Sequence, residues 1–288
     1  MRVYKHWDGP DPGGTPGRVF TASIGQETLV QGGAYLDKLA IGLKGAVATA
    51  AVVIEDFIDV LSEFDFWVGS ELRLKLDGND CCALSAYFYG QRPALGENTD
   101  ATGNDFAGGI FLPVQQAHDA AKPFSMAATR AAVTNIATET LSVTGYWLDA
   151  AGAGKPIHAV TVTLTSAGAT GDDQYNWQLP PTGRLMGLLA AMPAASDFAD
   201  GNIDVSFQRL KIMRSTSPVA EFNTLADGKP LVETNLVAQS IFADLLGRYK
   251  YFDLRPEGIN LKDGIYTIKI DNQDASDALR FIPIVEME

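Results

Sequence analysis

The sequence predicts an all-β fold made of two copies of one β unit, and two observations predict it. Most of the chain alternates between apolar and polar residues over short runs bounded by glycine and proline, as strands and turns do. The second observation is a recurring order of segments: a strand beside a proline, an extended run, and an alternating strand. This order occupies residues 110–113, 122–129 and 139–148, and it recurs at residues 251–256, 264–270 and 278–285.

The N-terminal part is predicted to be a flexible arm that leads into strands. Residues 8–17 hold four glycines and three prolines, a composition that neither packs well nor extends a helix or a sheet. We therefore expect an arm over residues 1–17 and regular structure from Arg18. Alternating strands are expected at residues 18–24, 35–44 and 46–54, and Phe57, Ile58, Leu61 and Phe64 have the spacing of a short helix.

A hairpin is predicted next. Residues 72–76 alternate strictly and run into Asp77-Gly78, a pair that favours the positive φ values of a tight turn. A further strand is expected at residues 83–89. Residues 91–109 are polar and rich in glycine, and loops of that length are usually functional or face a partner.

The boundary between the two copies is predicted within residues 150–156, which are small, rich in glycine and end in a proline. The predicted organisation is an arm (1–17), a first β domain (18–151) and a second β domain (152–288). In the second, residues 236–246 have helical spacing, with Gly247 as the stop signal. Its further strands are expected at residues 158–165, 185–192 and 203–212.

Composition restricts the function. The 288-residue chain is 46% hydrophobic and 20% charged, as in a globular protein with a substantial core. Its formal net charge of -13 argues against a nucleic-acid-binding face, because such faces depend on lysine and arginine to neutralise phosphates. We therefore expect no direct sequence-specific binding of nucleic acid.

Targeting and membrane-spanning segments are not expected. Residues 1–7 are partly basic but lack the apolar core of a secretory signal. The longest nearly uncharged apolar run, residues 46–54, is far shorter than the roughly 20 residues that cross a bilayer. The sequence therefore predicts synthesis in the cytoplasm.

The sequence predicts no enzyme and no cofactor. It lacks a phosphate-binding loop ending in Gly-Lys-Ser/Thr, a Gly-x-Ser-x-Gly elbow, a His-Glu-x-x-His pair and a dinucleotide fingerprint. His6, His118 and His158 fall singly in the arm, a loop and the start of a strand. Cys81 and Cys82 would point to opposite faces of a strand, so we expect two small buried side chains with no disulfide and no metal.

Two groups of polar and aromatic residues have a structural and a functional interpretation. The acidic groups lack the spacing of a calcium-binding loop, so solvated turns are favoured. The aromatic residues lie in or beside predicted strands, so barrel filling is favoured over a sugar-binding platform. The acidic groups are Asp77, Asn79 and Asp80, and Asp271, Asn272, Asp274 and Asp277; the aromatic residues are Trp67, Tyr87, Phe88, Tyr89, Tyr146 and Trp147.

The first seven residues are the candidate contact site. Arg2, Lys5 and Trp7 combine positive charge and an interfacial aromatic residue in a chain that is otherwise acidic. They could contact lipid headgroups or a neighbouring subunit, and a disordered end is the alternative.

The repeated unit resembles the double jelly-roll major capsid proteins of small icosahedral bacteriophages that contain an internal membrane. The resemblance rests on the proline-bearing strand followed by two strands in each copy, on the helix expected at residues 236–246, and on the strand and turn at residues 72–78. It covers residues 18–288. The first copy departs from the pattern, because residues 91–109 are rich in glycine where a helix would be expected.

This resemblance implies two jelly-roll β-barrels with short helices in loops, and a structural role in the virion. It implies a homotrimer that forms a pseudo-hexagonal capsomer of an icosahedral shell and contacts neighbouring capsomers, minor capsid proteins and internal membrane lipid. The protein would be made in the host cytoplasm and reside in the capsid. Two alternatives stay open: a carbohydrate-binding β-sandwich, and a phage spike or minor capsid protein.

Overall fold

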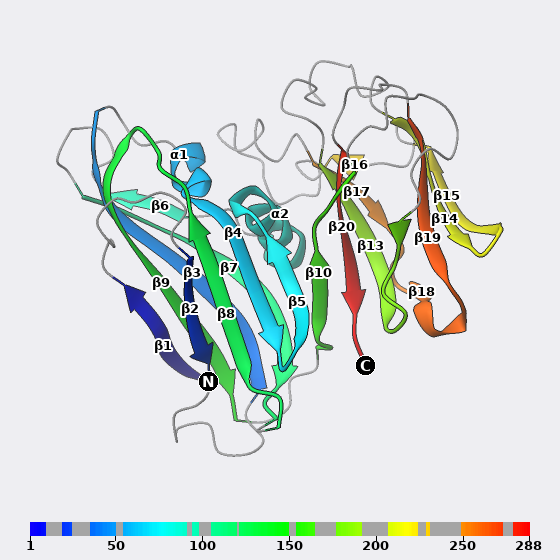
Figure 1. Cartoon of the computed structure of the whole chain (residues 1–288), viewed down its shortest axis with the longest axis horizontal. Coiled ribbons are helices and arrows are strands. Elements are labelled where there is room, and N and C mark those ends of the chain that lie inside the picture. Colours follow the sequence, from blue (N-terminus) through cyan, green and yellow to red (C-terminus); the bar gives the residue numbers. More distant parts are fainter. Residues whose placement is uncertain are drawn as a thin grey trace. The chain divides into compact units, whose positions relative to one another are not determined.

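A computed structural model gives the structure of the chain as two compact units, Met1–Ile157 and His158–Glu288 (Figure 1). The boundary predicted from sequence lay between residues 151 and 152. The structure describes residues 1–9, 19–24, 35–49, 54–90, 94–97, 105–119, 121–149, 154–164, 177–191, 207–223, 229–230, 249–272 and 279–288.

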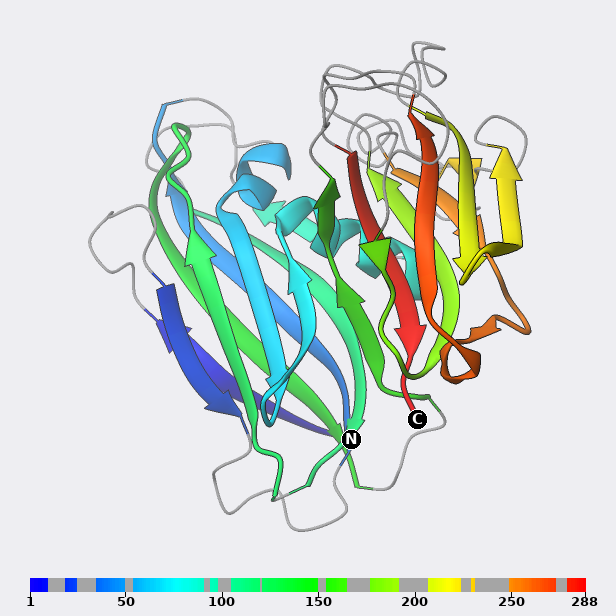
Figure 2. The same cartoon turned by 45° about the vertical axis from the view of Figure 1, so that its right-hand side comes forward.

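The first unit contains two antiparallel sheets that Figures 1 and 2 both show lying face to face. Trp147 and Phe124, one from each sheet, stack in the core between them, with ring centroids 6.0 Å apart. One sheet has the order β1 (Arg2–Gly9), β9 (Ile136–Leu148), β3 (Tyr35–Val47), β7 (Asp105–Ala117), β6 (Ala94–Glu97). The other has the order β5 (Glu71–Leu76), β4 (Leu61–Val68), β8 (Phe124–Arg130), β2 (Val19–Ile24).

The second unit repeats this design with shorter strands. One sheet has the order β16 (Lys229–Pro230), β17 (Tyr249–Asp253), β13 (Arg184–Ala191), β20 (Leu279–Glu286), β10 (Ile157–Val160). Two short strands lie beside it: β11 (Val162–Leu164) pairs with β20, and β18 (Ile259–Asn260), which precedes the 3-10 turn η4 (Leu261–Asp263), pairs with β13. The other sheet has the order β12 (Trp177–Gln178), β19 (Tyr266–Asn272), β14 (Phe207–Arg214), β15 (Ser217–Asn223).

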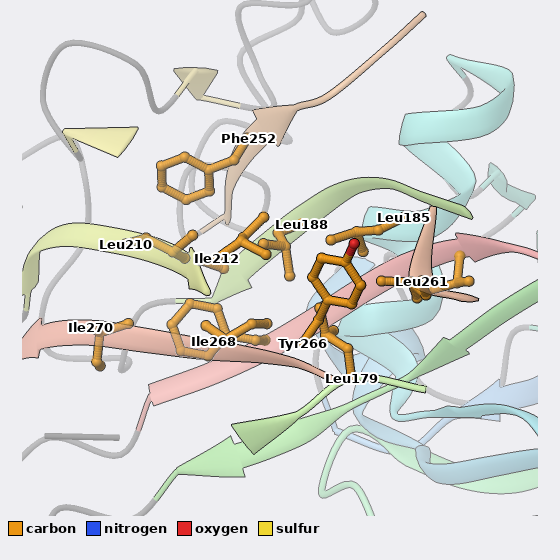
Figure 3. Close-up of a cluster of buried hydrophobic side chains, with 13 residues drawn as sticks. Leu179, Leu185, Leu188, Leu210, Ile212, Phe252, Leu261, Tyr266, Ile268 and Ile270 are labelled. Carbon is orange, nitrogen blue, oxygen red and sulfur yellow. The ribbon is translucent and has the colours of Figure 1, made fainter. Parts of the chain in front are cut away.

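The core of the second unit lies between these sheets. Figure 3 shows Leu188 of β13 beside Leu210 and Ile212 of β14, with Ile268 and Tyr266 of β19 close by. All five side chains are at most 4% exposed. Burial of this apolar surface, at about 25 cal/mol per Å², is the main force that holds the two sheets together.

The strand order of the two units is the same, and it is the jelly-roll order. If the eight main strands of each unit are numbered along the chain, one sheet reads 1-8-3-6 and the other 2-7-4-5 in both units. The predicted repeat is therefore confirmed: the three recurring segments are β7, β8 and β9 in the first unit and β17, β19 and β20 in the second. The predicted fold class, all-β with two jelly rolls and short helices in loops, is confirmed with it.

The predicted hairpin at Asp77-Gly78 was wrong, because this pair begins a helix. The Asp77 side chain accepts a hydrogen bond of 2.9 Å from the Asp80 backbone N–H and caps α2 (Gly78–Tyr89). The strand predicted at residues 83–89 is therefore helical. The β4–β5 hairpin instead turns at Gly69, whose φ of +61° suits glycine. The first copy thus has a helix before β7, although residues 91–109, where the resemblance led us to expect one, contain no helix at their described positions.

Two other element boundaries differ from the prediction. The strand expected at residues 46–54 ends at Val47, and Ile54 begins the short helix α1 (Ile54–Asp59). The predicted loop at residues 91–109 contains β6 and the start of β7. The helix predicted at residues 236–246 lies outside the described residues.

The prediction of a flexible N-terminal arm was wrong for residues 1–9. Arg2–Gly9 forms β1 and pairs with β9 in a register that opposes Arg2 to Trp147 and Gly9 to Leu141. Residues 2–7 contain neither glycine nor proline and can form a ladder, whereas the glycine and proline content that suggested flexibility begins at Gly9. Residues 10–18 lie outside the described part of the chain.

Candidate interaction surface

The residue types that often serve in catalysis or metal binding are either far apart in this structure or packed as part of the fold. His118 follows β7 and packs edge-on against Phe124 and Trp147, with ring centroids 5.7 and 6.2 Å apart. His6 lies on β1 and His158 on β10. Among the residues that the structure describes, no group of three His, Cys, Asp or Glu side chains could hold a metal ion.

Cys81 and Cys82 are free thiols buried in α2. The sequence prediction of two small buried side chains is confirmed, although they lie in a helix instead of a strand. Burial raises the pKa of both thiols well above the ordinary value, and the nearby carboxylates of Asp77 and Asp80 raise it further. Thiolate chemistry is therefore suppressed at this site.

The polar group Asp77, Asn79 and Asp80 lies at the N-terminus of α2. Asp77 is the N-cap, and Asp80 is completely buried in the first turn, where a negative charge favours a helix N-terminus. The second acidic group begins with Asp271 and Asn272 at the end of β19, and residues 273–278 lie outside the described residues.

The predicted contact residues Arg2, Lys5 and Trp7 all lie on β1, at one edge of their sheet. A register shift separates Lys5 from Trp7. Two apolar residues of this terminus are exposed, Met1 by 72% and Val3 by 52%. None of the helices in the described part of the chain has the length and apolar character needed to cross a bilayer.

The outward side of the sheet β9-β3-β7 is a second candidate surface, which sequence reasoning missed. In β3 the inward residues Leu39, Ile41 and Leu43 are 0–2% exposed, so the residues between them face outward. We call the outward set the outer face. It consists of Lys38, Ala40, Gly42 and Lys44 of β3, their partners Tyr146, Thr144, Ser142 and Thr140 of β9, and Phe111, Gly109 and Ala107 of β7. Pro113, the β7 residue opposite Lys38, is buried and is not included.

Lys38 is held on the outer face by three aromatic rings. Its ammonium nitrogen, Nζ, lies 4.8 Å from the ring centroid of Phe111, 5.2 Å from that of Tyr146 and 5.3 Å from that of Tyr89 in α2. Phe111 and Tyr146 also meet edge to face at 5.8 Å. These distances are within the range of cation–π attraction.

The hydroxyl of Tyr89 is buried beside this cluster and has no hydrogen-bond partner among the residues that the structure describes. Burial, followed by the charge of Asp37 and by Tyr35, raises the pKa of Tyr89 well above its ordinary value. Burial and Asp37 raise the pKa of Tyr35 to about 12, and its hydroxyl donates a 2.9 Å hydrogen bond to the Gly154 carbonyl. Both phenols therefore stay neutral.

The opposite sheet of the first unit carries a paired set of charges. Lys75 Nζ lies 2.8 Å from Glu63 Oε2 and 3.8 Å from Asp65 Oδ1. The hydrogen bond to Glu63 is the main cause that raises the pKa of Lys75. For Asp65, burial raises the pKa more than Lys75 lowers it. Lys75 is thus paired with carboxylates of its own sheet.

Comparison with known proteins places the fold. No protein-family model matches the chain, and no curated protein matches it. The STIV MCP, from Sulfolobus turreted icosahedral virus, is similar in fold with a TM-score of 0.65 at 13% identity over 99% of this chain and 97% of that one. PBCV-1 VP54, fitted into a reconstruction of the virophage Sputnik, has a TM-score of 0.60 at 10% identity over 99% and 93%.

The major capsid protein P2 of bacteriophage PM2 has a TM-score of 0.56 at 8% identity, over 100% of this chain and 97% of that one. At such low identity the three similarities establish the fold alone. They cover both units and nearly all of each matched chain, so the similarity concerns the double jelly roll as a whole.

Proposed function

We propose that the protein is a structural virion component, the major capsid protein of an icosahedral virus. The observation that carries the proposal is the repeated 1-8-3-6 and 2-7-4-5 strand order, which gives two jelly rolls in one chain. The fold of PM2 P2, a major capsid protein by name, matches this arrangement over 97% of its length. The dispersed histidines and inert cysteines favour a structural role over an enzymatic one.

The proposed assembly unit is a homotrimer. Two jelly rolls per chain give six per trimer, so three identical chains would present a nearly sixfold outline and tile as a pseudo-hexagonal capsomer. Closed rings of this kind need a heterologous contact between copies, which the long strands and polar flanks of jelly rolls can supply. Neighbouring capsomers and minor capsid proteins are the further partners proposed.

The N-terminal strand is proposed to contact membrane lipid or an adjacent subunit. Arg2 and Lys5 would each contribute on the order of 1 kcal/mol near an anionic surface, and Trp7 favours the headgroup region. The exposure of Met1 and Val3 on the same segment supports this assignment. The protein would be synthesised in the host cytoplasm and reside in the virion.

Mass measurement of the purified chain tests the proposal. Light scattering coupled to size exclusion should give three times the 30.8 kDa chain mass, and electron microscopy should show hexagonal particles or tiles. A monomer that binds glycans would favour the carbohydrate-binding β-sandwich instead. A trimer that forms no lattice and occurs in a few copies per virion would favour a spike or minor capsid protein.

A further inference from the structure

The outer face carries positive charge and has no carboxylate among its own residues. Of its eleven residues, Lys38 and Lys44 are charged and the rest are small, hydroxyl-bearing or aromatic. Neither lysine forms an ion pair with any residue that the structure describes.

The side chain of Lys38 is preorganised for contact with another molecule. The rings of Tyr89, Phe111 and Tyr146 fix its ammonium group, so little side-chain entropy remains to be lost on binding. Tyrosine and other aromatic residues around a fixed cation are typical of the residues that dominate interface energies. Lys44 is exposed, two β3 residues beyond Gly42 on the same side.

We propose that a second copy of this chain covers the outer face of the first unit and places carboxylates against Lys38 and Lys44. The inference rests on the proposed function, which requires copies of the chain to pack side by side. Charge complementarity favours this occupant: with 35 acidic and 22 basic residues, a copy of the chain has more carboxylates than cations to offer. Two cations are too few for a nucleic acid, whose binding depends on many phosphate contacts.

The geometry of the face suits a neighbouring protein surface. Between the two lysines, Ala40 and Gly42 lie opposite Thr144 and Ser142 on one side, and Gly42 lies opposite Gly109 on the other. These side chains do not project far, so another surface can approach the strands closely. The lysines would then define the ends of the contact, about 20 Å apart at 3.3 Å per residue.

The test compares the full-length chain with Lys44→Glu. Lys44 is exposed, so the substitution should leave the fold intact, and sedimentation should show association weakened by about tenfold or more. Lys44→Gln should weaken it less. Lys122→Glu is the matched control, because Lys122 is exposed near the β7–β8 turn and the change in charge is the same. It should associate like the unaltered chain.

Amine acetylation gives a second measurement that needs no substitution. In the assembled protein Lys44 should be protected relative to Lys122, and the protection should disappear after dissociation. Equal labelling of the two lysines in the assembly, or equal weakening by Lys44→Glu and Lys122→Glu, would overturn the inference. If the unaltered chain remains monomeric, the proposed function fails as well; if it assembles and Lys44→Glu assembles equally, this inference alone fails.

Discussion

Trp147 of β9 lies flat against Phe124 of β8, with the two ring planes 12° apart, and this stack joins the two sheets of the first unit. Both side chains are at most 2% exposed, and His118 closes the group edge-on. This aromatic contact between the seventh and eighth main strands is therefore part of the core of the first unit.

Trp147→Ala should destabilise the first unit by about 3–5 kcal/mol, because it leaves a large cavity between the sheets. Urea unfolding followed by circular dichroism would measure the loss. The control is Val219→Ala on the edge strand β15, where Val219 is 45% exposed and the change should be within about 0.5 kcal/mol. Similar losses for the two variants would contradict a core role for the stack.

Gly78→Ala should also destabilise the protein, although it adds a single methyl group. A Cβ at Gly78 would lie 2.1 Å from the Ile58 carbonyl oxygen, so α1 and α2 would have to separate. The expected loss is about 1–3 kcal/mol, as for other overpacked sites. Gly109→Ala is the control, because its Cβ would meet nothing closer than 3.6 Å. Thermal unfolding of both variants would decide, and an unchanged midpoint for Gly78→Ala would refute the close approach.

The thiols of Cys81 and Cys82 should not react with a disulfide reagent in the folded protein. Both are completely buried and their pKa values are raised, so neither access nor thiolate is available. Two thiols per chain should become reactive in denaturant. Ser70→Cys, at the exposed β4–β5 turn, provides a positive control that should react at once. Rapid labelling of the unaltered native chain would show that α2 opens.

Asp65→Asn should change how stability depends on pH. Burial holds the folded pKa of Asp65 above its ordinary value of 3.8, so the folded state is favoured while the carboxyl is protonated. This contribution is complete below pH 3.8 and is lost as the pH rises through the folded pKa. The free energy of unfolding of Asp65→Asn, relative to the unaltered chain, should therefore increase from pH 3 to pH 7.

Urea titrations at a series of pH values would measure that trend, with Asp119→Asn as a control in an exposed turn. A difference between Asp65→Asn and the unaltered chain that falls as the pH rises would mean that Lys75, and not burial, governs the Asp65 carboxyl.

The recurring strands could be predicted from sequence because their periodicity is local. Residues 110–113 and 251–256 stand at equivalent places in the two units, as the repeat implied. The start of α2 could not be predicted this way, since Asp77-Gly78 suits both a helix cap and a hairpin turn. Packing against Ile58 decides between them, and that contact is invisible in a local window.

The outer face was missed for the same physical reason. Lys38, Tyr89, Phe111 and Tyr146 come from β3, α2, β7 and β9, and no spacing along the chain indicates that they meet. The strand β1 was missed because glycine and proline begin only at its last residue, and the flexibility inferred from them was extended back over residues that contain neither.

The 1-8-3-6 order also has a consequence for the timing of folding. In each sheet of this kind the first main strand has the last one as its neighbour. The pairing of β1 with β9, and of β10 with β20, can therefore form only after the later strand has been made. During translation, neither unit can complete its sheets before its eighth main strand has left the ribosome. Such long-range closure is slow, and during it the early strands have unpaired edges. The rate at which new chains pair with each other, relative to the rate of translation, would then limit the yield of folded protein.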